Sequence, residues 1–266
     1  MLGRERLKRL AALKEKKYRR RYGRFLVEGP HLIQELAMSD WPVEWLLLTP
    51  DRAKDPALRQ ARRKLEGRGA SVALLSEADM ARLSEVATSQ GVVAVCPLPD
   101  RSWSQKQLAS WRRVLLLDGL GDPGNVGAII RTAAWFGWDA VLLGPGSADP
   151  YNPKAVRASM GGLFFVPVYE VSLEEALEAL LTHDVALWAA VAEGGRPLGE
   201  GVPVPERVAL LIGSEAAGIR PQWLKRAHAR VCIPRLGRGV ESLNAAVAAG
   251  ILLAYLSGLG PKTSAG

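Results

Sequence analysis

The spacing of hydrophobic and polar residues divides the first hundred residues into short strands and helices that alternate. Apolar runs of strand length occur at FLVEG (25–29), VEWLLLT (43–49), SVALL (71–75) and GVVAV (91–95). Helical spacing is present at 30–38 and 56–66, and Ser76 with Asp79 three residues later has the capping-box pattern of a helix start. This alternation predicts a small α/β sandwich.

The second half of the chain contains continuous apolar runs, which are typical of strands buried on both faces of a parallel sheet. The predicted strands are VLLLD (114–118), AVLL (140–143), VALWAAV (185–191), VALLI (208–212) and RVCI (230–233). Helices are expected at 125–137, 172–182 and 221–228, and a last, Ala-rich helix is expected to begin at Ser242, whose hydroxyl can cap it. The predicted fold class is therefore α/β.

A domain boundary is expected between these halves. The chain has 266 residues, which is enough for two domains with separate cores. Residues 99–112 contain serines and charged residues without a clean hydrophobic period, so we expect a linker there. The first domain is then expected at 1–98 and the second at 113–260.

Basic residues outnumber acidic ones, with 35 Lys and Arg against 27 Asp and Glu, a formal charge of +8 and a pI near 9.7. This excess favours a polyanionic partner, and nucleic acid is the first candidate. In residues 4–22, leucines recur at helical spacing while basic residues take most other positions. Such a helix is either a solvated surface or an arm that contacts phosphates, and we favour the arm. The RNA contacts expected on it are Lys16, Lys17, Arg19, Arg20 and Arg21.

The cysteine count and the lengths of the apolar runs indicate the cellular compartment. The two cysteines, Cys96 and Cys232, are too few for a disulfide framework or a Cys-rich metal site, so we expect no metal and a reducing environment. No apolar run approaches the length that crosses a bilayer, and the first residues lack the apolar core of a signal peptide. We therefore expect a cytoplasmic protein.

One loop allows an oxidoreductase hypothesis. Residues 119–124, GLGDPG, match the G-x-G-x-x-G pattern between a predicted strand and a predicted helix, and Asp139 lies at about the distance expected for a ribose-binding acid. Pro123 stiffens a turn where a dinucleotide fingerprint needs a pliable backbone. The dinucleotide hypothesis is therefore an alternative that ranks low.

Polar residues recur directly after the predicted strands. Asn125 stands at a helix start. Arg131 in the same helix has Ala and Ile neighbours, so we expect the helix to be covered on most sides. A charged side chain in such a helix is expected to have an ion-pair partner or a functional role. Glu215 lies between two glycines at the carboxyl end of a strand, where open α/β sheets bind ligands. Ser242 and Asn244 mark the start of the last helix.

These segments resemble a known family. NVGAIIRTA (125–133), LLIGSEAAGI (210–219) and IPRLGRGVESLNAAVAAGILL (233–253) are similar to the three ordered motifs of the SpoU (TrmH) branch of the SPOUT RNA 2′-O-ribose methyltransferases. NPKAVRASMGGLFFVPV (152–168) resembles the family's connecting segment, and the FLVEG region resembles the L30e-like substrate-binding domain of many members. The resemblance covers nearly the whole chain.

The resemblance implies a cofactor, a topology and an assembly. It implies an enzyme that uses S-adenosyl-L-methionine, with a parallel-sheet SPOUT domain ending in a deep trefoil knot and a small N-terminal L30e-like domain. Carried over to this sequence, Gly213, Ile233 and Leu243 are expected to contact the cofactor. Family members are homodimers with the active site near the subunit interface, so a homodimer is expected.

The resemblance also implies roles for the polar residues. The family proposal assigns activation of the 2′-hydroxyl to the arginine at position 131, with Asn125, Glu215, Ser242 and Asn244 as further catalytic residues. A guanidinium with a pKa above about 12 is normally protonated, so we expect Arg131 to be essential but to orient a phosphate and stabilise an alkoxide more than to act as the base. Two arginines in 235–240 depart from the family pattern and suggest extra RNA contact.

Ribosomal RNA of the 23S type is favoured over transfer RNA as the substrate because a separate L30e-like domain is present. Lys154 and Arg157 in the connecting segment join the expected RNA contacts. A tRNA 2′-O-methyltransferase and an RNA-binding protein without catalytic activity are the alternatives, and the nucleotide that is methylated is not specified by the sequence.

Overall fold

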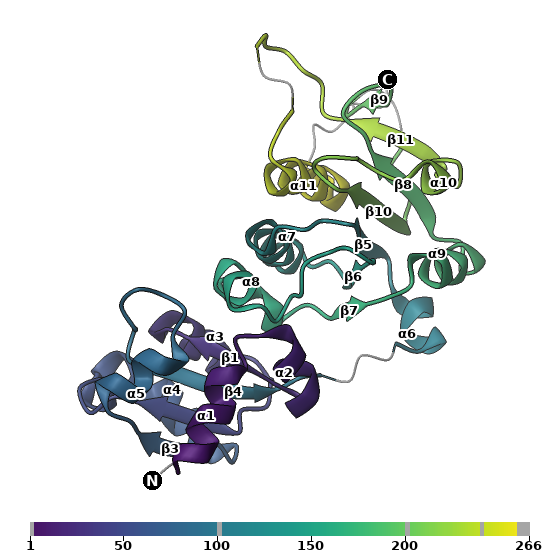
Figure 1. Ribbon diagram of the computed structural model, residues 1–266. Helices are drawn as coiled ribbons and strands as arrows, with labels where there is room; N and C mark the ends of the chain where they lie inside the picture. The colour runs from purple at the N-terminus through teal and green to yellow at the C-terminus, as the bar shows by residue number, and fades with distance from the viewer. Residues whose placement is uncertain (1–2, 100–102, 200–202, 240–241, 260–266) are drawn as a thin grey trace. The chain divides into compact units, whose positions relative to one another are not determined.

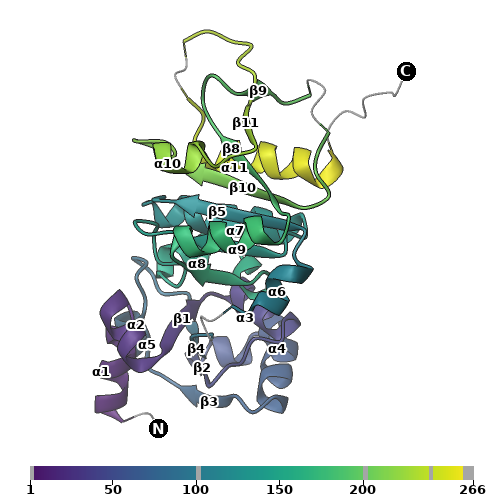
Figure 2. The ribbon, with the colours of Figure 1, turned by 90° about the vertical axis from the view of Figure 1, so that its right-hand side faces the viewer.

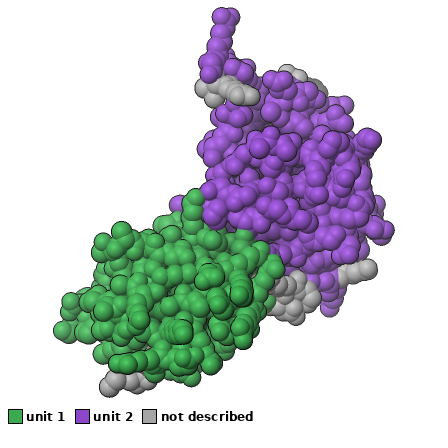
Figure 3. All heavy atoms as spheres, viewed as in Figure 1, with its two compact units in different colours: residues 1–100, 149–165 green, residues 101–148, 166–266 purple. Residues whose placement is uncertain are grey.

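The computed structural model describes residues 3–99, 103–199, 203–239 and 242–259. The chain divides into two compact units, of which unit 1 comprises residues 1–100 and 149–165 and unit 2 comprises residues 101–148 and 166–266 (Figure 3). Residues 149–165, which the sequence analysis assigns to the second domain, therefore pack within unit 1. Among the described residues, no helix combines the length and the hydropathy needed to cross a membrane.

Unit 1 is built on a mixed four-stranded sheet with the order β1-β4-β2-β3 (Figure 1). Its strands are β1 (Arg24–Glu28), β2 (Trp45–Leu48), β3 (Ser71–Leu74) and β4 (Val92–Pro97). Strand β4 is antiparallel to β1 and β2, and β2 is parallel to β3. The helices before residue 100 are α1 (Arg4–Ala12), α2 (Lys16–Tyr22), α3 (Pro30–Met38), η1 (Arg52–Lys54), α4 (Pro56–Gly67) and α5 (Glu77–Leu83). The side chain of Ser76 caps α5 as predicted, accepting a hydrogen bond from the Asp79 amide at 3.1 Å.

The basic N-terminal segment is two helices instead of one. Helix α1 ends at Ala12 and α2 begins at Lys16. Leu7, Leu10 and Leu13 are buried in a cluster with residues of β1, β2, α5 and β4, so the segment is part of the core of unit 1 and not a separate arm. Its apolar face is needed for packing, which explains the helical spacing of the leucines.

Arg19 does not contact solvent, and its assignment as an RNA contact is wrong. Its side chain is 2% exposed, and its Nη2 and Nε atoms donate to Asp149 Oδ2 at 2.7 and 3.1 Å. Its Nη1 donates to the carbonyl oxygens of Leu13 at 2.9 Å and Lys14 at 2.6 Å. Because a buried guanidinium needs partners for its donors, Arg19 joins the break between α1 and α2 to a segment 130 residues away.

The segment 149–165 is also held by aromatic packing. It contains α8 (Pro153–Ala158) and η2 (Gly162–Phe164), and Asn152 caps α8 by accepting a hydrogen bond from the Lys154 amide. The ring of Tyr151 lies 5.0 Å from that of Phe25 and 6.4 Å from that of Trp41, and Phe164 lies 5.8 Å from Trp41. The segment thus completes the core of unit 1 through both apolar and ionic contacts.

Unit 2 contains a seven-stranded sheet in which all described pairs are parallel, with the order β7-β6-β5-β10-β8-β11-β9. Its strands are β5 (Arg113–Asp118), β6 (Ala140–Leu143), β7 (Val168–Glu170), β8 (Ala186–Ala190), β9 (Arg196–Pro197), β10 (Val208–Gly213) and β11 (Ala229–Cys232). Its helices are α6 (Gln105–Ser110), α7 (Pro123–Trp135), α9 (Leu173–Thr182), α10 (Pro221–Leu224), α11 (Ala245–Ala254) and η3 (Tyr255–Leu259). The α/β fold with a parallel sheet is therefore confirmed. The strands β7 and β9 have two or three residues each and were not predicted.

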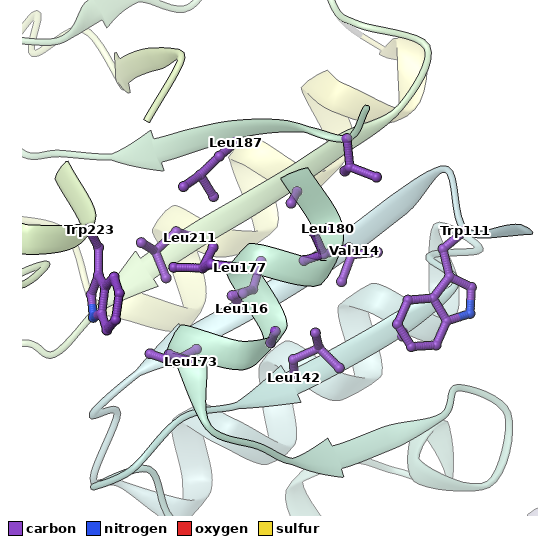
Figure 4. Close-up of a cluster of buried hydrophobic side chains, with 14 of the residues drawn as sticks. Trp111, Val114, Leu116, Leu142, Leu173, Leu177, Leu180, Leu187, Leu211 and Trp223 are labelled. Atoms are coloured by element: carbon purple, nitrogen blue, oxygen red, sulfur yellow. The ribbon is translucent and has the colours of Figure 1, made fainter. Parts of the chain in front are cut away.

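Helices cover both faces of this sheet. Helices α7 and α11 lie side by side on one face, and α6, α9 and α10 lie on the other (Figure 1). Leu173, Leu177 and Leu180 of α9 point into a buried cluster over the strands, with Trp111 and Trp223 at its ends (Figure 4). The continuous apolar strands follow from this arrangement because each strand buries alternate side chains on opposite faces.

Part of the expected linker is a structured element of unit 2. Ser104 and Gln107 form a capping box at the start of α6, and Leu108 and Trp111 are buried in the core cluster. Arg207 donates hydrogen bonds to the carbonyl oxygens of Leu108 and Trp111, which closes the end of the helix. A helix of six residues is too short to show a hydrophobic period, so the pattern analysis missed it.

We expect Arg19→Met to destabilise the protein by about 3–5 kcal/mol, because it leaves the Asp149 carboxylate buried without its cation. Urea unfolding followed by circular dichroism measures the change. The matched control is Arg21→Met on the same helix, whose exposed side chain should contribute less than about 0.5 kcal/mol. The double substitution Arg19→Met with Asp149→Leu should recover part of the loss, and equal values for Arg19→Met and Arg21→Met would contradict the assignment.

Candidate active site

Three polar loops begin at the carboxyl edge of the unit 2 sheet. The first follows β5, the second follows β10 and the third follows β11. Strands β5 and β10 are adjacent and parallel, and Asp118 at the end of one is in register with Gly213 at the end of the other. Because parallel strands end at the same edge, the loops that contain the predicted site residues start close together.

An ion pair between a buried carboxylate and a partly exposed guanidinium joins the first two of these loops. Asp118 is 3% exposed, and Arg220, which follows the second loop, donates to its Oδ1 atom from Nη2 at 2.6 Å and from Nε at 2.9 Å. The hydrogen bond to Asp118 raises the pKa of the Arg220 guanidinium above its usual value because it stabilises the charged form. The guanidinium also lies over the ring of Trp223 at 5.3 Å. This pair was not predicted, and its one local signal in the sequence is an acid at the end of the run VLLLD.

The second loop is closed on itself by backbone hydrogen bonds. The amide of Ser214 donates to the Gly218 carbonyl oxygen at 3.1 Å, and the amide of Gly218 donates to the Ser214 carbonyl oxygen at 2.9 Å. A Cβ atom at Gly213 would lie 2.2 Å from the carbonyl carbon of Gly218, so only glycine fits there. The tight loop leaves Glu215 exposed at its tip.

Hydrogen bonds of Asn125 connect all three loops. Asn125 lies in the first turn of α7, and its Nδ2 atom donates to Glu215 Oε1. Its Oδ1 atom accepts a hydrogen bond from Asn244 Nδ2 at 3.1 Å. Asn244 is the N-cap of α11, and its Oδ1 atom accepts from the amides of Ala246 at 2.9 Å and Val247 at 3.3 Å. Three of the predicted site residues, Asn125, Glu215 and Asn244, are therefore brought together from distant parts of the chain.

The N-cap of the last helix is Asn244 and not Ser242. Helix α11 begins at Ala245, and Ser242 lies exposed in the preceding loop. Asparagine and serine cap helices about equally well, so sequence preference could not separate them. The side-chain carbonyl of Asn244 serves the helix while its amide group reaches Asn125, so one residue has both a structural and a connecting role.

Helix α7 is buried along one side, as expected from its Ala and Ile residues, but Arg131 lies on the exposed side. Helix α7 turns Val126, Ile129, Ile130 and Ala133 inward, and Arg131 lies on its outer surface. Its side chain forms no hydrogen bond or ion pair with any residue in the described ranges. Six residues separate it from Asn125, which is about 1.7 helical turns, so the two side chains leave α7 from different faces.

The residues expected to contact the cofactor lie around the end of β8. Gly213 ends β10 and Ile233 follows β11, and both of these strands are neighbours of β8. Residues 233–239 project away from the sheet (Figure 1 and Figure 2). Leu236 and Leu243 in the third loop expose 96% and 48% of their surface, while Val240 and Glu241 lie outside the described residues. The strand ends thus offer backbone polar groups, and the third loop offers exposed apolar side chains.

The dinucleotide hypothesis does not fit this geometry. Asp139 Oδ2 accepts hydrogen bonds from the amides of Arg112 at 2.7 Å and Arg113 at 2.8 Å. These amides are at the amino end of β5, whereas the glycine loop follows its carboxyl end, so Asp139 cannot reach a ribose held by that loop. The loop itself ends in a helix cap, in which Asp122 accepts a hydrogen bond from the Asn125 amide at 2.8 Å.

The other expected RNA contacts lie in unit 1. Lys17, Arg20 and Arg21 are exposed on α2, and Lys16 is half-buried. In α8, Lys154 is exposed, while Arg157 is half-buried and its Nη1 atom is buried without a hydrogen-bond partner among the described residues. The structure thus leaves most of these cations accessible, with Arg19 as the exception.

Comparisons with known proteins agree with this arrangement. Residues 112–254 match the model of the SpoU rRNA Methylase family, and residues 4–94 match the MRM3-like substrate binding domain. The chain is 36% identical to the 23S rRNA (guanosine(2553)-2'-O)-methyltransferase RlmP of Bacillus subtilis, over 92% of this chain and 93% of that protein. It is 31% identical to the 23S rRNA (uridine(2479)-2'-O)-methyltransferase of Streptomyces viridochromogenes, over 91% of this chain and 85% of that protein.

A solved structure extends the likeness to the fold. The SpoU methyltransferase AviRb from Streptomyces viridochromogenes, in complex with the cofactor AdoMet, matches with a TM-score of 0.83 and 29% identity, covering 97% of this chain and 98% of that one. The family model covers more than half of the present chain, and both relatives match it over nearly its full length. The protein therefore belongs to the SpoU rRNA methylase family.

Proposed function

We propose that this protein is an S-adenosylmethionine-dependent methyltransferase that modifies the ribose 2′-hydroxyl of a nucleotide in 23S-type ribosomal RNA. The observation that carries the proposal is the hydrogen-bonded chain from Glu215 through Asn125 to Asn244, which gathers the three loops at the ligand-binding edge of the sheet. The relatives named for 23S rRNA act on guanosine in one case and uridine in the other, so they support the ribose, and not a particular base, as the reacting group.

S-adenosylmethionine, when bound, supplies an electrophilic methyl group on a sulfonium. We assign its contacts to the backbone at Gly213 and Ile233 and to the side chain of Leu243. The protein's task is to place the ribose oxygen in line with that methyl group, because positioning dominates such a transfer. Asn125 and Asn244, which already fix each other, are suited to hold the ribose and its phosphate, and Glu215 fixes Asn125 by accepting its amide hydrogen bond.

We propose that Arg131 acts through the positive charge of its guanidinium. A guanidinium stays protonated in water, so Arg131 is suited to bind the phosphate next to the reacting ribose and to stabilise the oxygen as its negative charge develops. Its exposure and its lack of a partner among the described residues leave all of its donors available to RNA. We assign to Ser242, which is exposed in the third loop, a further hydrogen bond to the same substrate.

A homodimer is proposed to cover the outer surface of α7 and α11. Trp135 of α7 is 83% exposed, and Val247 and Ile251 of α11 are 52% and 40% exposed. The two helices are in contact, and a Cβ atom on Gly250 would lie 4.0 Å from Thr132 Cγ2. A second copy seated on this apolar surface would also shield the neighbouring Arg131 from water, which would strengthen its interaction with a phosphate.

The C-terminal trefoil knot is likewise proposed on the basis of the family resemblance. It is supported by the return of α11 to pack against α7, the first helix after β5. Trp138 Nε1 donates to Ser257 Oγ at 3.1 Å, and Tyr255 Oη accepts from the Gly199 amide at 3.2 Å. These two contacts hold the end of the described chain against segments that precede it by 119 and 56 residues.

The proposed activity predicts that the purified protein transfers tritium from methyl-labelled S-adenosylmethionine to an unmodified 23S rRNA transcript. The label should lie on ribose, and the bond after the modified nucleotide should resist alkaline hydrolysis because its 2′-oxygen is blocked. Label on a base, or none on any RNA, would contradict the proposal. An unmodified tRNA mixture serves as the comparison, and stronger labelling of tRNA would favour the alternative substrate.

Arg131→Ala should lower kcat by about 10²–10³-fold, because a preorganised donor at the reacting oxygen is lost. The dissociation constant for S-adenosylmethionine, measured by calorimetry, should change by less than about twofold, since Arg131 lies outside the loops assigned to the cofactor. Arg131→Lys tests whether charge alone suffices, and we expect it to recover only part of the rate. An equal loss of cofactor affinity and turnover in Arg131→Ala would mean that the residue is structural.

The proposed dimer predicts a mass of two chains in analytical ultracentrifugation. Trp135→Glu should weaken association by at least about thirtyfold, since a charge replaces a large apolar anchor. Met38→Glu is the matched control, because Met38 is 69% exposed on α3 of unit 1 and lies outside the proposed interface. A monomeric wild-type protein, or equal effects of the two substitutions, would refute the interface.

A further inference from the structure

An arginine-lined hollow lies on unit 1, and its lining includes none of the cations assigned to RNA above. It has a volume of about 290 Å³ and is bounded by the end of β2, by η1 and by one side of α4. Its polar lining is dominated by Arg52, Arg59, Arg62 and Arg63, with Asp55 and Glu66 as the acids. Four positive charges against two negative ones leave the hollow with a net charge of +2.

The four arginines fall into two pairs. Arg52 donates to Asp55 Oδ2 at 3.0 Å and to the Gln90 carbonyl oxygen at 2.9 Å, and Arg62 donates to Glu66 Oε1 at 3.2 Å. These two are neutralised and held in place, and they form part of the wall. Arg59 and Arg63 are exposed, and neither forms a hydrogen bond or an ion pair with any residue that the structure describes. The uncompensated charge of the hollow therefore resides on them.

The placement of these two cations is unfavourable for the helix itself. Arg62 has an acid four residues later, which is the stabilising arrangement on a helix surface. Arg59 instead has Arg63 four residues later, and like charges at this spacing destabilise a helix by roughly 0.2–0.5 kcal/mol. Asp55 lies four residues before Arg59 and Glu66 lies three residues after Arg63, but these acids accept hydrogen bonds from Arg52 and Arg62. Arg59 and Arg63 are both exposed and do not pack in the core.

We propose that the hollow on α4 binds consecutive backbone phosphates of the RNA substrate through Arg59 and Arg63, with Arg52 and Arg62 as its fixed walls. This inference rests on the proposed function, since it takes ribosomal RNA as the ligand. Guanidinium groups bind phosphate oxygens through two parallel hydrogen bonds, and side chains four residues apart on a helix are neighbours on one face. The contact positions the RNA on unit 1 and reads no sequence.

The test is the binding of a fluorescent, unmodified 23S rRNA fragment, measured by anisotropy over a range of salt concentrations without S-adenosylmethionine. In the double variant Arg59→Gln/Arg63→Gln, the slope of log K against log salt should fall by about 1.5, corresponding to two lost phosphate contacts. Glutamine has a helix propensity similar to that of arginine and carries no charge, so the fold is retained, and circular dichroism verifies this. The affinity at low salt should fall roughly tenfold or more.

The matched control is Arg9→Gln/Arg82→Gln, which removes the same charge from exposed arginines of unit 1 that are ion-paired with Glu5 and Asp79. Its slope should change by less than about 0.5 if the phosphates bind at the hollow. Equal changes in the two double variants would overturn the site and leave only general attraction. Methyl transfer is scored separately, so a wild-type protein that binds through the hollow but methylates no RNA would refute the proposed function and not this site.

Discussion

The pairing of parallel strands β5 and β10 is the constraint on which the candidate active site depends. It places the ends of two strands at one level, so that Asp118 and the second loop meet. A carboxylate buried to 3% exposure must have a partner, and Arg220 supplies it from the far side of the loop. The ion pair therefore fixes where the second loop enters and leaves the sheet edge, and Glu215 at its tip is positioned as a result.

Asn125 converts this edge into a single site. Its amide group bonds to the second loop and its carbonyl oxygen to the third, while its own backbone amide is held by Asp122. These bonds fix the orientation of the side chain and still leave one N–H and one lone pair of the amide group for a ligand, which favours a preorganised binding surface. Arg131 is the opposite case, because it is exposed and its side chain forms no hydrogen bond or ion pair with the described residues.

The arginines of unit 1 show that one residue type serves two purposes. Arg19 is buried, and its guanidinium donates to Asp149 and to two backbone carbonyl oxygens of the protein. Arg59 and Arg63 are exposed on α4 with no such partners in the described residues. The net charge of the chain counts buried and exposed arginines alike. Burial distinguishes an arginine in a structural ion pair from one that is available to bind phosphate.

Local patterns in the sequence determined most of the elements, because hydrophobic period and capping residues act over a few positions. The apolar runs at 114–118 and 208–212 were enough to predict β5 and β10. The family resemblance of three motifs, and not a local pattern, grouped Asn125, Glu215 and Asn244, whose side chains are hydrogen-bonded to one another in the structure. The short helix α6 was missed because six residues hold less than two turns of pattern.

Only the tertiary structure decided which residues of one chemical type carry each role. Arg19 differs from its neighbours because Asp149 lies beside it. Asp139 accepts a hydrogen bond from a backbone amide at the amino end of β5. Asn244 caps α11 in place of Ser242. Each of these outcomes depends on a partner or a boundary that no spacing rule reports. Buried polar groups take whichever partner the fold brings within hydrogen-bonding distance, and for Arg19 that partner is 130 residues away in the sequence.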